Sequence, residues 1–148
     1  MLNYSVSFPV NAIVFVYFWT VYWIDRELIY PQLLQEYYPP WVSNIEHGLI
    51  LPVALFNIVY QPFHMSRLLS YSMAGVSTLA YVAWIVHIYN VTGKWIYPFM
   101  NAMGTEQVLY IFFPLSLIVA VVFQNIGWRL NEMVHPSKHY VENNKKQN

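Results

Sequence analysis

Long apolar segments alternate with short polar ones along this chain of 148 residues. A helix that crosses the hydrocarbon core of a bilayer needs about 20 apolar residues, with a range of roughly 17–25. Four stretches lack any Asp, Glu, Lys or Arg: 1–24, 48–66, 68–93 and 107–128. The first, third and fourth reach this length directly. The apolar part of the second is short, so it either spans together with its flanking residues or is partly re-entrant.

The pattern predicts an all-α fold, a polytopic transmembrane helical bundle of about four spans. An unpaired peptide group in hydrocarbon costs several kcal/mol, so an isolated span can satisfy its backbone only as a helix. Residues 1–130 would form the transmembrane domain, and 131–148 a polar cytosolic tail that is expected to be disordered. The predicted spans are about 6–24, 47–64, 68–90 and 107–130.

Proline and aromatic residues indicate the character of the segments that connect the predicted spans. The segment 25–46 contains Pro31, Pro39 and Pro40, which exclude one continuous helix. The segment 91–106 begins with an aromatic stretch that suits a membrane interface, where Trp and Tyr are enriched. Three further prolines are expected in or near first helical turns, where proline is tolerated: Pro9, Pro52 and Pro114.

Composition supports a membrane protein and removes several classes of function. Charged residues make up 9% of the chain, against about 25% in an average soluble domain, and the mean hydropathy is +0.37. The chain has no Cys, which excludes disulfides, thiolate zinc sites and a Cys nucleophile. A net charge of zero gives no basic footprint for nucleic acid. The sequence does not define an oligomeric state.

The distribution of Lys and Arg predicts the orientation in the membrane. Arg26 and Lys94 lie in the two segments 25–46 and 91–106, and the remaining five lie on the other side. Cytosolic segments carry the excess of basic residues, so both termini are expected in the cytosol. Lys145 and Lys146 then resemble a dilysine retrieval signal, which predicts residence in the endoplasmic reticulum or endomembrane system. The five are Arg67, Arg129, Lys138, Lys145 and Lys146.

His47 is the candidate for chemistry, because it lies where a polar segment passes into an apolar one, near the depth of a lipid ester. A neutral imidazole can accept a proton there, since its unperturbed pKa of about 6.5 is close to working pH. Asn44, three residues earlier, could orient the ring if the segment is helical. Alternatively, His47 is an interfacial residue without a role.

The other histidines give weaker signals. His87 is an intramembrane ionisable residue, which is a functional hypothesis by default, but it could simply reach the interface. His64, His135 and His139 are expected to be solvated. The spacing of the five makes no recognisable metal site, and we expect no cofactor.

Several sequence blocks follow one another in a recognisable order: DRELIYP at 25–31, PW at 40–41 with Asn44, His47 and LP at 51–52, then VTG at 91–93 with Trp95 and YPF at 97–99. Together they resemble the androgen-induced and androgen-dependent TFPI-regulating membrane proteins, over about residues 9–128. The resemblance implies a multi-pass enzyme that hydrolyses fatty acid esters of hydroxy fatty acids with a Thr nucleophile and a His, and it places the catalytic His on His47.

The nucleophilic Thr of that family does not map onto this chain. The resemblance places it well upstream of the DRELIYP block, in an earlier span, and implies about six spans in all. The expectation is therefore that the N-terminal part of the family pattern is missing here. None of the four threonines corresponds to the nucleophile: Thr20, Thr78, Thr92 and Thr105.

Three interpretations follow. The first is a membrane lipid-ester hydrolase, or its His-bearing part, with membrane lipids and a lipid-ester substrate as partners. In it, Asn44, Glu46 and Asp25 support His47 by orienting the imidazole or stabilising charge. The second is a non-enzymatic multi-pass protein that acts as a regulatory or binding partner. The third is a proton-coupled carrier using His47 and His87.

Overall fold

The computed structural model describes residues 4–63 and 65–136, and in them every regular element is helical. Three long helices are α1 (Tyr4–Ile24), α2 (Pro40–Tyr60) and α3 (Arg67–Thr92). The fourth long helical stretch, Thr105–Val134, joins α5 (Thr105–Gln107), the π-helix η3 (Val108–Phe112) and α6 (Phe113–Val134). All four are long and apolar enough to cross a membrane, which confirms the predicted class of fold.

Short helices fill the two connections on one side of the bundle. The first contains η1 (Arg26–Leu28) and η2 (Gln32–Leu34), and the second contains α4 (Pro98–Met103). Asp25 starts η1 by accepting a hydrogen bond from the backbone N–H of Glu27 at 2.9 Å. The side chain of Glu27 in turn accepts a hydrogen bond from the backbone N–H of Gln32, and Arg26 lies over the ring of Tyr30.

The second span begins at Pro40, earlier than the predicted start at 47. A proline in the first turn costs no hydrogen bond, because the N–H that it lacks would have no helical partner there. Pro40 therefore starts the helix. Consequently Pro52 lies in the middle of α2 and not in a first turn, which corrects the expectation for that residue.

Pro114 lies in the first turn of α6, as predicted, although the continuous helical stretch already begins at Thr105. The turn before it is a π-helix, in which the N–H of Phe113 bonds to the carbonyl of Val108, five residues back. Proline removes the next backbone donor, so the regular hydrogen-bond pattern is interrupted at this point of the span. Such π-turns are frequent at functional sites.

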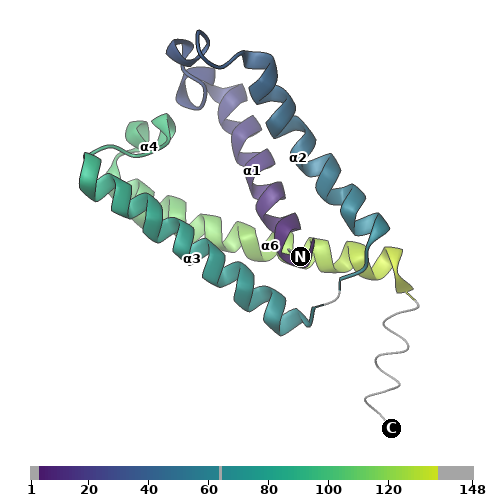
Figure 1. The fold of residues 1–148 in the computed structure, drawn as a ribbon. Helices are drawn as coiled ribbons and strands as arrows, with labels where there is room; N and C mark the ends of the chain where they lie inside the picture. Colours follow the sequence, from purple (N-terminus) through teal and green to yellow (C-terminus); the bar gives the residue numbers. More distant parts are fainter. Residues whose placement is uncertain (1–3, 64, 137–148) are drawn as a thin grey trace.

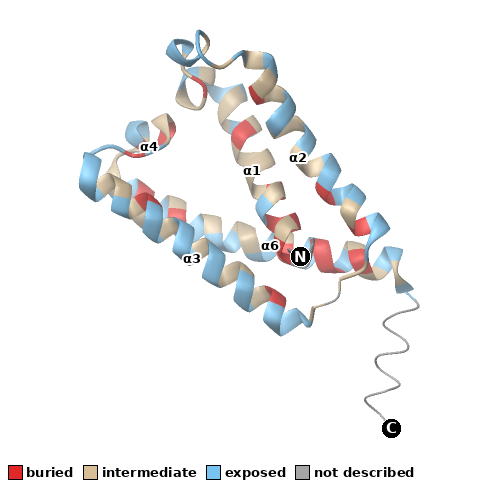
Figure 2. Cartoon of the chain, in the orientation of Figure 1, coloured by how far each residue is buried: buried red, intermediate tan, exposed pale blue. Residues whose placement is uncertain are grey.

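Helix α1 holds the bundle together by packing against both α2 and α6 (Figure 1). The buried residues form two clusters, and Figure 2 shows few buried positions along much of α2 and α3, as expected for helices that face lipid. One cluster lies around α4 and the facing parts of α3, η3 and α6: Ile85, Trp95, Phe99, Met100, Val108 and Phe113. The other joins α1 to α2: Phe8, Ala12, Ala54 and Ile58.

Polar contacts join the α2–α3 connection to the end of α6. The side chain of Asn131 is buried and accepts a hydrogen bond from the backbone N–H of Phe63 at 2.9 Å. Arg67 forms a salt bridge with Glu132 and lies over the ring of Trp128. Residues 131–134 therefore belong to the last helix and not to a polar tail.

His135 is also part of this joint, which corrects the expectation that it is solvated. Its Nε2 lies 2.8 Å from the carbonyl oxygen of Ile58, near the end of α2. Because a carbonyl can only accept, Nε2 carries the hydrogen. His64, His139 and the predicted tail beyond residue 136 lie outside the described residues.

Candidate functional site

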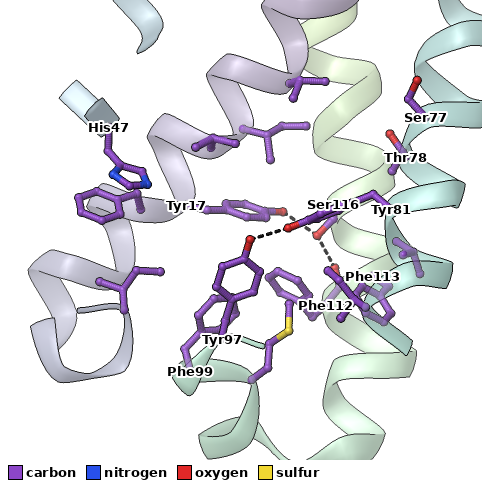
Figure 3. A pocket seen from close by; sticks show the side chains of 18 residues that line it. Tyr17, His47, Ser77, Thr78, Tyr81, Tyr97, Phe99, Phe112, Phe113 and Ser116 are labelled. Carbon is purple, nitrogen blue, oxygen red and sulfur yellow. Dashed lines mark hydrogen bonds between the residues drawn. The ribbon is translucent and has the colours of Figure 1, made fainter. Parts of the chain in front are cut away.

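A cavity of about 480 Å³ opens between the spans on the α4 side of the bundle (Figure 3). This volume is within the range of roughly 300–1,000 Å³ that is typical of small-molecule sites. Its wall is formed by α1, α2, α3, α4, the η3 turn and α6, and is mostly apolar. The polar residues in the wall are Tyr17, His47, Ser77, Thr78, Tyr81, Tyr97 and Ser116.

His47 lies about two turns into α2, and its ring is held in one orientation. Its Nδ1 is 2.8 Å from the backbone carbonyl of Ser43, one turn earlier. The carbonyl accepts, so in the neutral ring Nδ1 carries the hydrogen and Nε2 keeps a free lone pair. The ring of Phe18 stacks on the imidazole with the centroids 3.8 Å apart and the planes inclined by 10°. The site thus has a fixed proton acceptor.

The three residues predicted to support His47 have other partners or none. The ring is oriented by the carbonyl of Ser43, whereas the side-chain oxygen of Asn44 is buried without a hydrogen-bond partner among the described residues. Asp25 caps η1, and Glu46 accepts a hydrogen bond from the hydroxyl of Tyr38. Neither carboxylate lines the cavity. The hydrogen bond to Glu46 raises the pKa of Tyr38 to about 12, so this phenol stays protonated.

Hydroxyl groups from α3 and α6 complete the polar part of the wall. Thr78 donates to the carbonyl of Ala74 at 2.8 Å, and Ser116 donates to the carbonyl of Phe112 at 2.7 Å. The hydroxyl of Tyr17 donates to Ser116 at 3.0 Å. Figure 3 places Ser77 and Thr78 across the cavity from His47, and no hydroxyl among the described residues bonds to the imidazole. Of the four threonines, only Thr78 lines the cavity.

Tyr97 reaches the cavity because the second connection folds back into the bundle. The side chain of Asn101 binds both the N–H and the carbonyl of Trp95, at 2.9 and 3.0 Å, and so closes a tight loop before α4. Phe99 and Met100 are buried below that loop. Tyr97 then meets Tyr81, from the middle of α3, with the two hydroxyl oxygens 2.5 Å apart.

Sequence reasoning missed Tyr81 and Tyr97, because neither has a spacing that relates it to His47. His87, by contrast, is exposed, stacks against Trp84 and does not line the cavity. The structure therefore does not join His47 and His87 in one site, as a carrier using both would need. Lys145 and Lys146 lie outside the described residues.

Comparison with known proteins gives one family. The family model described as FAR-17a/AIG1-like protein matches residues 1–132. The androgen-dependent TFPI-regulating protein of Mesocricetus auratus is 31% identical over 132 residues, which are 88% of this chain and 57% of the relative. The androgen-induced gene 1 protein of Homo sapiens is 30% identical over 141 residues, 94% of this chain and 58% of the relative. The chain thus spans less than two thirds of the length of these relatives. No solved structure matches it.

Proposed function

This chain belongs to the FAR-17a/AIG1-like family of multi-pass membrane proteins, and on that premise we propose that it hydrolyses a lipid ester, with His47 as the general base. The partners in this proposal are membrane lipids and a lipid-ester substrate that enters from the bilayer. The site is expected in the endoplasmic reticulum or another endomembrane, where Lys145 and Lys146 would act as a retrieval signal.

One observation carries the proposal. The imidazole of His47 lies in the wall of an apolar cavity with Nδ1 committed to Ser43 and Nε2 left with its lone pair. A general base must have a free acceptor atom in one orientation, within reach of the proton that it removes. The stacked ring of Phe18 and the bond to Ser43 meet the requirement of orientation.

The reaction places the proton of the attacking group on Nε2. As the oxygen of a hydroxyl or of water attacks the ester carbonyl carbon, His47 takes its proton. It then returns a proton to the alkoxide when the carbon–oxygen bond breaks. If water attacks, the products are a carboxylic acid and an alcohol. If a hydroxyl attacks, the alcohol leaves and the acyl group stays on that oxygen, and water must then attack this new ester in a second round of the same steps to release the acid. The resemblance implies a Thr nucleophile, but no threonine here matches it, so the proposal assigns the base alone.

The test compares the rates at which two alanine variants hydrolyse a long-chain lipid ester, measured in membranes that contain the protein. General-base catalysis contributes about 10²–10⁴-fold, so His47→Ala should reduce the rate of hydrolysis by at least about 100-fold. His87→Ala is the matched control and should cost much less, since its ring is outside the cavity.

Two outcomes would contradict the proposal. Loss of turnover in His87→Ala with intact turnover in His47→Ala would remove the role of His47. A parent protein that hydrolyses no lipid ester would favour the non-enzymatic interpretation, in which the chain binds or regulates without chemistry.

A further inference from the structure

We propose that Tyr81 and Tyr97 together form a hydrogen-bond donor site that holds the carbonyl oxygen of a lipid whose acyl chain occupies the cavity. The inference deepens the proposed function. It rests on that function only in taking an ester as the natural ligand. It concerns recognition at a place in the wall that is separate from His47.

Most hydroxyl groups in the cavity wall have a hydrogen-bond acceptor within the protein. Thr78 and Ser116 donate to backbone carbonyls, and Tyr17 donates to Ser116. Ser77 is exposed and makes no hydrogen bond among the described residues, which is why it serves as a control below. The pair Tyr81 and Tyr97 differs, because two hydroxyls that share one hydrogen bond have two hydrogens between them. One hydrogen lies between the oxygens, and the other is left to donate.

The remaining hydrogen of the pair has no acceptor among the described residues. Both tyrosines line the cavity, and Figure 3 shows their hydroxyls meeting in its middle. No acceptor other than the partner oxygen bonds to either hydroxyl among the described residues. A hydroxyl hydrogen that faces an apolar space without an acceptor is costly, so the site is complementary to a ligand that brings an acceptor.

The position of Tyr81 in the span indicates the kind of ligand that reaches the pair. Tyr81 is in the middle of a membrane-spanning helix and is 50% exposed, so this wall meets the bilayer and not water. What enters from there is a lipid, and an acyl chain suits the apolar lining. A strong acceptor carried on an acyl chain at that depth is a carbonyl oxygen. The wall therefore fits an acyl ester or another carbonyl-bearing lipid.

A purely structural role for the pair makes a different prediction. If the bond between Tyr81 and Tyr97 serves only to hold α4 against α3, either single phenylalanine variant breaks it completely. If the pair is a donor site, either single variant leaves one hydroxyl whose hydrogen is no longer shared. The single variants and the double variant thus separate the two roles.

The experiment measures binding without turnover. Purified protein in lipid nanodiscs is titrated with a long-chain dialkyl ketone and with the alkane of the same length, each competing with a photoreactive alkane. One hydrogen bond to a neutral acceptor predicts a preference for the ketone of about three- to tenfold. Tyr81→Phe and Tyr97→Phe should each keep most of that preference, and the double variant should lose it. Unchanged alkane binding shows that each variant keeps the cavity.

Two controls lie in the same cavity. Tyr17→Phe and Ser77→Ala should leave the preference for the ketone unchanged. Single variants that each equal the double variant would overturn the inference, and so would a loss caused by either control. A second measurement needs only the unaltered protein: the infrared carbonyl stretch of the bound ketone should fall below its value in the protein-free bilayer, and an unshifted band would overturn the inference.

The ketone has no bond to hydrolyse, so the two proposals can fail separately. A clear preference for the ketone in a protein without hydrolytic activity would support the donor site and contradict the hydrolase. Hydrolysis that depends on His47, without any preference for the ketone, would support the hydrolase and overturn the donor site.

Discussion

At the scale of single residues, the side chain of Asn131 carries an interaction that connects distant parts of the chain. Its oxygen satisfies the backbone N–H of Phe63, just after α2, from a position near the end of α6. Asn131→Leu would keep the volume but leave this N–H without a partner. An unsatisfied buried donor costs about 1–3 kcal/mol, so the free energy of unfolding in detergent should fall by that amount.

Asn125→Leu is the matched control for this prediction. Asn125 lies on the same helix, but it is exposed and bonds to the hydroxyl of Tyr71 and to its own helix. No backbone donor loses its partner in that variant. An equal loss of stability in both variants would show that the bond to Phe63 is not the cause.

How far the sequence predicts the candidate site also depends on single residues. His47 could be found because a lone titratable group at an apolar border stands out in a chain with little charge. The groups around it could not, since Phe18, Tyr81 and Tyr97 come together only through tertiary packing. Its hydrogen-bond partner is a backbone carbonyl, which every residue type can supply, so no sequence pattern marks Ser43.

At the scale of helices, α1 and α6 approach each other closely at Gly127. A Cβ atom there would lie 2.7 Å from the ring of Phe8, which is itself buried. Small residues allow such close contact between membrane helices. Gly127→Leu should force α1 and α6 apart and lower the free energy of unfolding by about 1–3 kcal/mol, as overpacked cores do.

Gly75→Leu tests whether that effect comes from the contact. Gly75 lies in α3, and a Cβ atom there would meet nothing within 4 Å. The same substitution should therefore leave stability unchanged or raise it slightly, because leucine favours a helix more than glycine does. Thermal unfolding of both variants in one detergent makes the comparison. A Gly127 variant as stable as the parent would contradict the close packing.

The sequence predicted the helices better than their ends. Long uncharged segments locate the four spans, because hydrocarbon permits no other isolated structure. The start of α2 at Pro40 was not predicted, since proline both ends and begins helices. The π-turn before Pro114 and the fold of the second connection into the bundle depend on packing around Phe99 and Phe113, which local patterns do not report.

At the scale of the whole molecule, the distribution of basic residues predicts that both termini are cytosolic. Four spans return the chain to the side on which it started, in agreement with this orientation. Glycosylation reporters fused to either terminus should remain unmodified, and one inserted after Leu34 should be modified. A modified C-terminal reporter would contradict the orientation.

The second prediction at this scale concerns the organelle in which the protein resides. Lys145 and Lys146 should retrieve the protein to the endoplasmic reticulum if the C-terminus is cytosolic. Replacing both with Ser should shift a tagged protein to later compartments. Microscopy would show this shift, and so would the processing of glycans on a glycosylation site introduced into a luminal loop. An unchanged distribution would show that these lysines do not retain the protein.

The exposed face of Tyr81 at the cavity wall has a consequence for how catalysis would be measured. A ligand that enters sideways from the bilayer is supplied in two dimensions, and its effective concentration is its mole fraction among lipids. The apparent KM, expressed as the amount of substrate per volume of sample, should therefore rise when inert lipid is added at constant volume. Adding buffer, which dilutes the vesicles but not the membrane, should leave the rate per protein molecule unchanged.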